Sequence, residues 1–573
     1  MARANEAAPV STPGSSEQEK ANGRGEEETE EGRATHHHLA KAVTNNPHEF
    51  HEVEGYVIDD SEEGEGVRYA KDGHTRLIPQ PSDDPNDPLN WSWRKKHVIL
   101  LIVAAAAFLP DYGSATGAVT LEAQAVYVVS LSLPSIFLLP YLYLDYPDVT
   151  SRKTGLTISN RQWNTTADEV NHTQAGNVFM LGAGGVFAVM FSAYFGRLPV
   201  MFYFLCIALG TAAWCAAATN FNSFFTARIL NGFFSTVTQG GGMMFIQDMF
   251  FFHERPRKIN IWASFFVMSP YMGPLLAAFM ITTKPWPVPF WVYTAETGLV
   301  LLLTIFFVDE TYYDRRVAPA SQPPRGSHMA RLLGIAQFRS RAMRNSFPQA
   351  CMRVVRVILK PTVALSAVYY MLTFAWVVGI NTTLSIFLTP LYNFGPLQIG
   401  YFYFTPVVAV LLGEATGHWL HDLVARRYIK SHNGHFEPEV RLRAIFFSLP
   451  FMIVGLVLIG QSLQNAWHFM ALSVSWGLYV YGIMVTTVAI SSYCLDSYPE
   501  ASGEVSAHLN NARTLGGFII SYFQVTWADS AGPKNSFGVQ AAILAAAFAI
   551  VIVLMVWGKR MRVWAGPLNF ATA

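Results

Sequence analysis

The chain has 573 residues, of which 51% are hydrophobic, 14% are aromatic and only 14% are charged. Soluble domains carry roughly 25% charged residues, so this composition indicates a chain embedded in a lipid bilayer. The formal net charge is zero, which gives no support for nucleic acid as a partner. The four cysteines have no paired spacing, and we therefore expect no disulfide framework, no metal site and no cofactor.

Residues 1–88 are rich in Glu, Ser, Gly and Pro and poor in large apolar side chains. Such a segment buries too little surface to offset the entropy of ordering, so we expect a disordered tail. No charged segment followed by an apolar core opens the sequence, which indicates that no signal peptide is cleaved and that the tail is cytosolic. Trp91 and the basic run Arg94, Lys95, Lys96 then mark the cytoplasmic border of a first membrane helix.

Twelve segments are apolar and long enough to cross a hydrocarbon core of about 30 Å. They fall into two groups of six, near 97–120, 174–194, 199–218, 222–247, 258–282 and 287–308, and near 359–389, 396–424, 443–463, 466–490, 508–528 and 536–557. The sequence therefore predicts an all-α integral membrane protein with two six-helix bundles, at 97–308 and 359–558.

The distribution of basic residues orients these segments. The linker 309–358 holds nine arginines, and further basic residues lie in the loops after the fourth and eighth segments and in the tail 559–573. Loops rich in Lys and Arg stay on the cytoplasmic side, so both termini are expected in the cytosol, most simply at the plasma membrane.

Residues 122–172 are expected to form a long outer loop. Its stretch from Val126 to Tyr143 is apolar but interrupted by Pro134 and Pro140, and a crossing there would move the arginine-rich linker outside. Asn164 and Asn171 begin glycosylation sequons, which fits an outward face.

The second and third segments are joined by a tight turn that contains Gly196 and Arg197. The loop is too short to cross the bilayer, so the arginine marks the cytoplasmic boundary of this helix pair.

Several stretches resemble the major facilitator superfamily, in its fungal drug:proton antiporter-like branch and most closely the polyamine and cation transporter subgroup. They are DPNDPLNW, LPDYGSATGAV, GRLPV, VDETYYDRR, RRYIKSHNGHFEPEVRLRA and DSYPEASGEVSAHLNNARTLGGF. The resemblance covers about residues 80–560 and implies secondary transport by two rocking bundles. Residues 128–162 have no counterpart in it, and we interpret them as an insertion or a retained intron.

The resemblance also assigns conformational roles. In the family's first loop motif only Gly196 and Arg197 match, and Ala193 and Tyr194 replace the expected acid and base. Arg197 is therefore expected to pair with Asp248 or Glu254. Arg228 is similar to the family's membrane arginine, and the dipeptide Gly273-Pro274 is similar to its antiporter signature.

Charged residues inside membrane spans are costly and usually face a cavity or a partner. Asp111 and Arg228 lie at depths that would let them pair, so Asp111 either binds a proton or cation or forms a structural ion pair. Glu296 and Glu414 lie near mid-membrane, where desolvation favours the protonated carboxyl group. For Glu414 the only basic residue of its own half within a span is Arg513.

Polar and aromatic side chains offer walls for a cation, because aromatic faces attract ammonium groups. They are Gln239, Tyr370, Trp376 and Asn381. At the cytoplasmic side Asp496, Glu500 and Glu504 either gate against Arg426 and Arg427 or are simply solvated. Neither run of glycines follows a strand or carries the Lys-Ser/Thr of a nucleotide site, which argues against an ATP-driven pump.

The sequence thus predicts a monomeric transporter, not an enzyme, that moves a small organic cation or polyamine with protons as the coupling ion. The alternative is an exporter of a fungal secondary metabolite or drug. A transport-inactive sensor would need a long cytosolic tail, which residues 559–573 do not supply.

Overall fold

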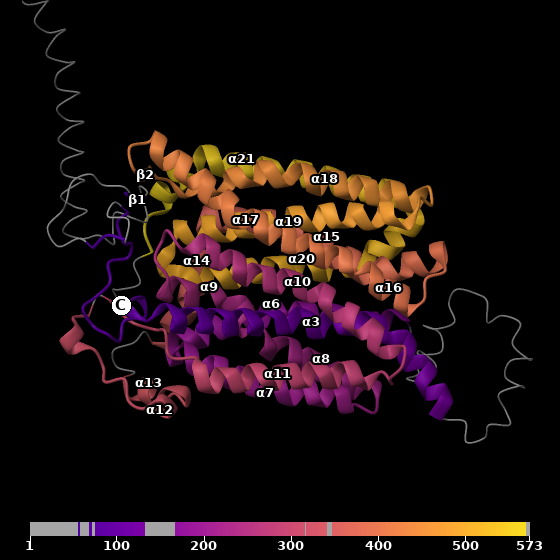
Figure 1. Cartoon of the computed structure of the whole chain (residues 1–573), viewed down its shortest axis with the longest axis horizontal. Helices are drawn as coiled ribbons and strands as arrows, with labels where there is room; N and C mark the ends of the chain where they lie inside the picture. The colour runs from indigo at the N-terminus through magenta and orange to yellow at the C-terminus, as the bar shows by residue number, and fades with distance from the viewer. Residues whose placement is uncertain are drawn as a thin grey trace, which may run out of the picture.

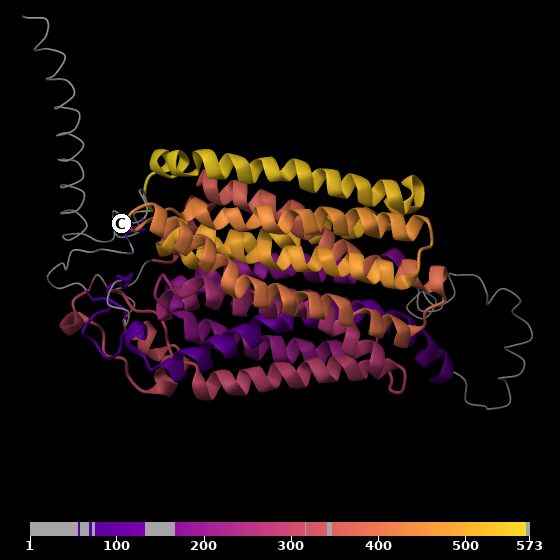
Figure 2. The same cartoon turned by 45° about the horizontal axis from the view of Figure 1, so that its top comes forward.

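The computed structural model describes residues 56–57, 68–70, 75–131, 167–315, 317–340 and 346–568. Within these ranges the chain folds almost entirely into helices that run side by side along one axis (Figure 1). In Figure 1 most helices of the first half lie in the lower part and most helices of the second half in the upper part. The two groups remain separate when the molecule is rotated (Figure 2).

The first bundle contains six membrane segments, of which the fourth consists of two helices. They are α3 (Trp93–Leu131), α6 (Ala167–Phe195), α7 (Arg197–Ala217), α8 (Phe221–Ser235) with α9 (Val237–Met249), α10 (Arg255–Ile281) and α11 (Pro287–Phe307). The second bundle contains α15 (Pro361–Tyr392), α16 (Pro396–Phe402) with α17 (Phe404–Ser431), α18 (Arg443–Gln464), α19 (Phe469–Ser497), α20 (Ser502–Ala531) and α21 (Pro533–Ala565).

Among the described residues, 10 helical segments are long and apolar enough to cross a membrane. The other two segments of the twelve are the α8–α9 pair, which is interrupted at Thr236, and α20, which carries more polar residues. Large apolar side chains cover the outside of the bundles: Phe306 is 71% exposed, Val556 62% and Leu412 58%. Large exposed apolar surfaces are favourable in contact with lipid and unfavourable in contact with water. The helix arrangement and this surface confirm the prediction of a two-bundle membrane fold.

Helix boundaries differ from the predicted ones at the first loop. The predicted outer loop 122–172 begins and ends as helix, because α3 continues to Leu131 and α6 starts at Ala167. Asn171 lies within α6. Asn164 and the remainder of this segment, which includes most of residues 128–162, lie outside the described residues.

The linker 309–358 is more structured than a simple loop. It contains η2 (Pro319–Ser321), α12 (His328–Leu332), α13 (Ile335–Arg339) and the amphipathic α14 (Phe347–Ile358). The basic loops, α12, α13 and the end of α21 lie at one end of the molecule (Figure 1), which we call the basic-loop end.

The prediction of disorder for residues 1–88 is wrong for the described parts of that segment. β1 (Tyr56–Val57) pairs with β2 (His435–Phe436) in the second bundle. Asp87 caps the short helix η1 (Pro88–Asn90) and forms a 2.8 Å ion pair with Arg315 of the linker. Apolar and charged partners in distant loops order these residues, which local composition does not reveal. Residues 1–55, 58–67 and 71–74 lie outside the described residues.

Candidate functional site

A buried ion pair joins the two bundles near the middle of α3. Arg513 Nη1 of α20 donates to Asp111 Oδ2 of α3 over 2.9 Å. Gln239 Nε2 of α9 donates to the same carboxylate oxygen over 2.6 Å. Asp111 is 7% exposed, Arg513 3% and Gln239 1%, so the pair is shielded from solvent screening and its Coulomb attraction is stronger than in water.

The arginine is held from its own helix and by aromatic rings of both bundles. Asn510, one turn before Arg513 on α20, accepts from Arg513 Nε over 3.1 Å. The guanidinium lies 5.2 Å from the ring centroid of Phe266 on α10 and 5.1 Å from that of Phe374 on α15. These contacts fix the direction of the guanidinium toward Asp111.

The same cluster connects α20 to the break between α8 and α9. Asn510 Nδ2 donates to the backbone oxygen of Leu181 on α6 over 3.0 Å, and Thr236 Oγ1 donates to Gln239 Oε1 over 3.3 Å. Because Thr236 separates α8 from α9, the interrupted fourth segment places Gln239 beside the ion pair. We call Asp111, Gln239, Asn510 and Arg513 the central cluster.

The predicted pair between Asp111 and Arg228 does not form. Arg228 Nη2 donates instead to the backbone oxygen of Ser114 over 2.7 Å. Its guanidinium packs over the rings of Phe224 and Phe290, at 5.6 and 5.9 Å from their centroids. Arg228 therefore turns into the first bundle, whereas Asp111 faces the second.

The other two membrane carboxylates lie apart from this cluster. Glu296 on α11 is half-buried, and its Oε2 has no hydrogen-bond partner among the described residues. The hydroxyl of Tyr112 faces this carboxyl group. Glu414 on α17 receives Asn260 Nδ2 of α10 at 3.2 Å on Oε1 and at 2.7 Å on its backbone oxygen. Within the described residues neither carboxylate forms an ion pair, and Arg513 is engaged by Asp111 and not by Glu414.

Three residues predicted to form the walls of a cation site, Tyr370, Trp376 and Asn381, lie on α15. The hydroxyl of Tyr370 lies 3.2 Å from Thr487 Oγ1, and Trp376 Nε1 is buried with no hydrogen-bond partner among the described atoms. Asn381 Nδ2 donates over 3.0 Å to the backbone oxygen of Pro270 on α10, so this side chain also bridges the bundles.

The turn between α6 and α7 places Arg197 against α9. Gly196 has φ 100°, a conformation that favours glycine. Arg197 forms an ion pair with Asp248 and donates to the backbone oxygen of Met244 over 2.8 Å. Arg197 was expected to pair with Asp248 or Glu254, and in the structure its partner is Asp248.

Gly273 lies where α10 crosses α3. A Cβ atom added there would approach the backbone oxygen of Tyr112 to 2.6 Å. The missing side chain therefore permits this close crossing, while Pro274 follows within the helix.

The acids Asp496 and Glu504 follow neither alternative that the sequence offered. Within the described residues neither pairs with Arg426 or Arg427, and neither is solvated, because Asp496 is 1% exposed and Glu504 3%. Both arginines are exposed. Asp496 pairs with Arg441 at 2.9 Å, and Glu504 pairs with Arg353 at 2.7 Å. The acids find arginines of η4 (Pro438–Leu442) and α14 that lie nearer in space.

Several bridging residues were not singled out from the sequence. Arg257 of α10 pairs with Asp422 of α17 at 2.6 Å, and Asn260 and Asn510 also span the bundles. Each is a polar side chain in or beside a predicted span, which is the signal that would have found them.

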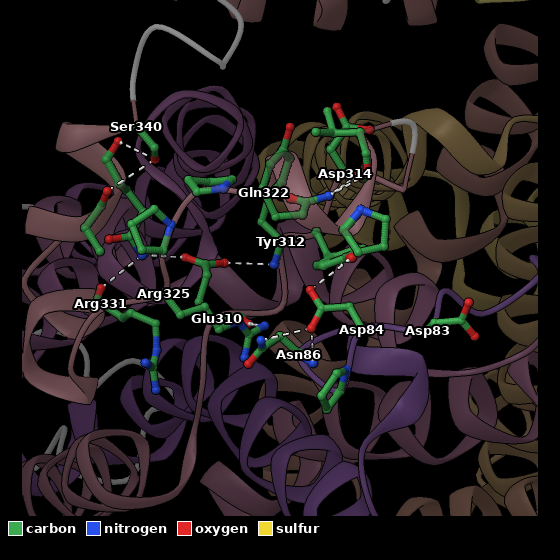
Figure 3. Close-up of a pocket in the computed structure, with 18 residues that line it drawn as sticks. Asp83, Asp84, Asn86, Glu310, Tyr312, Asp314, Gln322, Arg325, Arg331 and Ser340 are labelled. Carbon is green, nitrogen blue, oxygen red and sulfur yellow. Dashed lines mark hydrogen bonds between the residues drawn. The ribbon is translucent and has the colours of Figure 1, made fainter.

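A pocket of about 430 Å³ lies at the basic-loop end, between the lead-in to α3 and the linker (Figure 3). Its central acid, Glu310, accepts from the backbone N–H groups of Arg197 at 3.2 Å and Tyr312 at 3.0 Å, and from Gln337 Nε2 at 2.9 Å. The carboxylate is thus committed to holding the linker against α7, and we assign the pocket no part in transport.

The chain is similar to known transporters along most of its length. The sequence profile described as Major Facilitator Superfamily matches residues 118–521. The uncharacterized MFS-type transporter C1271.10c of Schizosaccharomyces pombe is 21% identical, over 86% of this chain and 89% of its own length. The efflux pump radE of Floropilus chiversii is 22% identical, over 84% of this chain and 83% of its own. The crystal structure of the human organic anion transporter MFSD10 superposes with a TM-score of 0.53 at 18% identity, covering 80% of this chain and 99% of that one.

Proposed function

Because the chain belongs to the Major Facilitator Superfamily, we propose that it is a proton-coupled secondary transporter that moves a small organic cation across a membrane by alternating access. In this mechanism the two bundles rock about a central site and expose it in turn to each side.

The observation that carries the proposal is the ion pair between Asp111 and Arg513. It joins α3 of one bundle to α20 of the other inside the membrane region. A proton on Asp111 removes the charge that attracts Arg513, so the protonated and ionised forms favour different arrangements of the bundles. That difference is what couples proton binding to movement.

The carboxylates support the proposed substrate class. Glu414 and Glu296 have no ion-pair partner among the described residues, and Glu414 sits at the contact between α17 and α10. A protonated amine would compensate such a charge. Aromatic rings attract ammonium groups, and Tyr370 and Trp376 of α15 are buried aromatic side chains. Polyamines are the first substrates to test.

A second candidate is export of a fungal metabolite or drug. This candidate is supported by similarity to relatives that are named as exporters, among them the efflux pump radE at 22% identity. For either candidate we propose a monomer in the plasma membrane. We also propose that both termini are cytosolic, because the basic loops lie at the same end as the lead-in to α3 and the end of α21.

Uptake of labelled spermine by proteoliposomes under an imposed pH gradient tests the proposal. We expect accumulation by the wild-type protein and loss of accumulation in Glu414→Gln, with Arg427→Ala, an exposed arginine, as the matched control. Gradient-driven accumulation that is unchanged in Glu414→Gln would remove the carboxylate assignment. Absence of spermine transport together with efflux of a neutral drug would favour the second candidate.

A further inference from the structure

A short stretch before the first membrane helix is fastened to the second bundle. β1 runs antiparallel to β2, with Tyr56 opposite Phe436 and Val57 opposite His435. The hydroxyl of Tyr56 donates to the backbone oxygen of Asp496, at the end of α19, over 2.6 Å. Figure 1 shows β1 beside β2 at the basic-loop end.

The same stretch is fastened to the first bundle. The ring of Tyr56 lies 4.3 Å, centroid to centroid, from that of Phe252, which follows α9. The backbone N–H of Phe252 donates to the backbone oxygen of Ile78 over 2.8 Å. Tyr56 thus contacts both halves of the molecule, and we call the described residues 56–57 and 75–80 the strap.

These contacts form a small core of their own. Tyr56 is 1% exposed, Ile78 6%, Phe252 2% and Phe436 1%, and they pack with Ala425, Tyr428 and Val440 separately from the main core of the bundles. Arg441, paired with Asp496 at 2.9 Å, lies over the rings of Phe252 and Phe436 at 5.8 and 4.8 Å from their centroids. The site is therefore buried, largely apolar and shared by residues of both bundles.

We propose that the strap is an intramolecular lock that holds the two bundles together at the basic-loop end and so opposes opening of the transporter toward that side. Opening there separates Phe252 from Phe436 and Asp496, and Tyr56 cannot keep its contacts with both. Because the strap contacts exist only in the closed arrangement, they shift the population toward it.

This inference rests on the proposed alternating-access function, but its test needs no substrate. Spin labels on cysteines introduced at the exposed positions His253 and Lys430, one on each bundle, report the separation of the halves in a background without the native cysteines. In Tyr56→Ala we expect the population at the longer distance to rise roughly tenfold, because aromatic packing and a buried hydrogen bond are both lost. Tyr56→Phe, which removes only the hydroxyl, is expected to give a smaller rise.

Tyr313→Ala is the matched control. The hydroxyl of Tyr313 contacts Ser82 at 3.3 Å and Asp84 at 3.2 Å, all on the first-bundle side, so its loss should leave the distance distribution unchanged. If Tyr56→Ala has the same melting temperature as the wild-type protein and also the same distance distribution, the lock is refuted. If Tyr56→Ala lowers the melting temperature, the milder variant Tyr56→Phe is used instead. A distance distribution of Tyr56→Phe that equals the wild-type distribution then refutes the lock. A shift with Asp111→Asn but not with either Tyr56 variant would refute the strap and leave the proposed function standing.

Discussion

Arg513 of α20 reaches across the bundle interface to Asp111 of α3, with 2.9 Å between Nη1 and Oδ2. The two residues are separated by 402 positions in the sequence, and they are both buried. A buried ion pair is worth little relative to an apolar pair of the same shape, but removing one partner strands the other charge. Loss of either charge is therefore expected to weaken this contact.

Single and double replacements of this pair should differ sharply. We expect Asp111→Leu or Arg513→Met alone to lower the free energy of unfolding by about 3–5 kcal/mol, because an uncompensated buried charge remains, and the double variant to recover much of that loss. Thermal unfolding in detergent measures it. The exposed pair of Lys559 and Glu437, whose side chains are 49% and 31% exposed, is the control and should couple by about 0–1 kcal/mol. Additive losses at Asp111 and Arg513 would show that the pair is not coupled.

The crossing of α3 and α10 depends on the absence of a side chain at Gly273. We expect Gly273→Ala to destabilise the protein by about 1–3 kcal/mol, since its Cβ would stand 2.6 Å from a backbone oxygen. Gly210→Ala on α7 is the matched control, because nothing lies within 4 Å of the added atom, and it should raise stability by about 0.5–1 kcal/mol through helix propensity. Equal melting temperatures for the two variants would contradict the close crossing.

Arg197, which is half-buried and paired with Asp248, and Arg427, which is exposed, should differ in their effect on stability. Arg197→Ala leaves Asp248 without its ion pair, and we expect a loss of about 3 kcal/mol. Arg427→Ala removes an exposed charge and should change stability by less than about 0.5 kcal/mol. The melting temperatures of the two purified variants check this, and a loss for Arg427→Ala as large as that for Arg197→Ala would restore Arg427 as a gating contact.

Acid should loosen the linker through Asp309. Burial raises the pKa of this carboxyl group, but Lys95 at 2.8 Å and the charges of Arg331 and Arg325 outweigh burial and hold the pKa below its ordinary value of 3.8. A lowered folded pKa stabilises the protein at every pH above 3.8, and this contribution is lost as the pH falls through the folded value.

Asp309→Asn should therefore melt below the wild-type protein at neutral pH, and the gap should narrow as the pH falls below 3.8. Asp83→Asn is the control, because the Asp83 side chain is 86% exposed and its loss should open no comparable gap. A gap for Asp309→Asn that stays constant through the acid range would mean that the carboxylate charge does not stabilise the linker.

The membrane architecture could be predicted from the sequence because it depends on length and polarity along the chain. Twelve apolar segments, a basic linker and the turn at Gly196 are all local patterns, and each has its counterpart in the structure. The breaks at Thr236 and Tyr403 were not predicted, since an apolar run of constant composition does not show where a helix is interrupted.

The partners inside the membrane could not be predicted in the same way. Sequence gives the depth of Asp111 and Arg228 in the bilayer, and their depths are compatible with a pair. It does not give the rotation of each helix, and rotation turns Arg228 toward Phe224 and Phe290 while Asp111 faces α20. The order at Tyr56 was missed for a related reason, because its partners lie on loops of both bundles.

The most direct test of proton coupling is the pH dependence of the distance between the bundles, measured with the labels at positions 253 and 430. We expect the wild-type distribution to change with pH, and Asp111→Asn, which cannot ionise, to show the same distribution at every pH tested. A variant that follows pH as the wild-type protein does would contradict the claim that a proton on Asp111 releases the bundles.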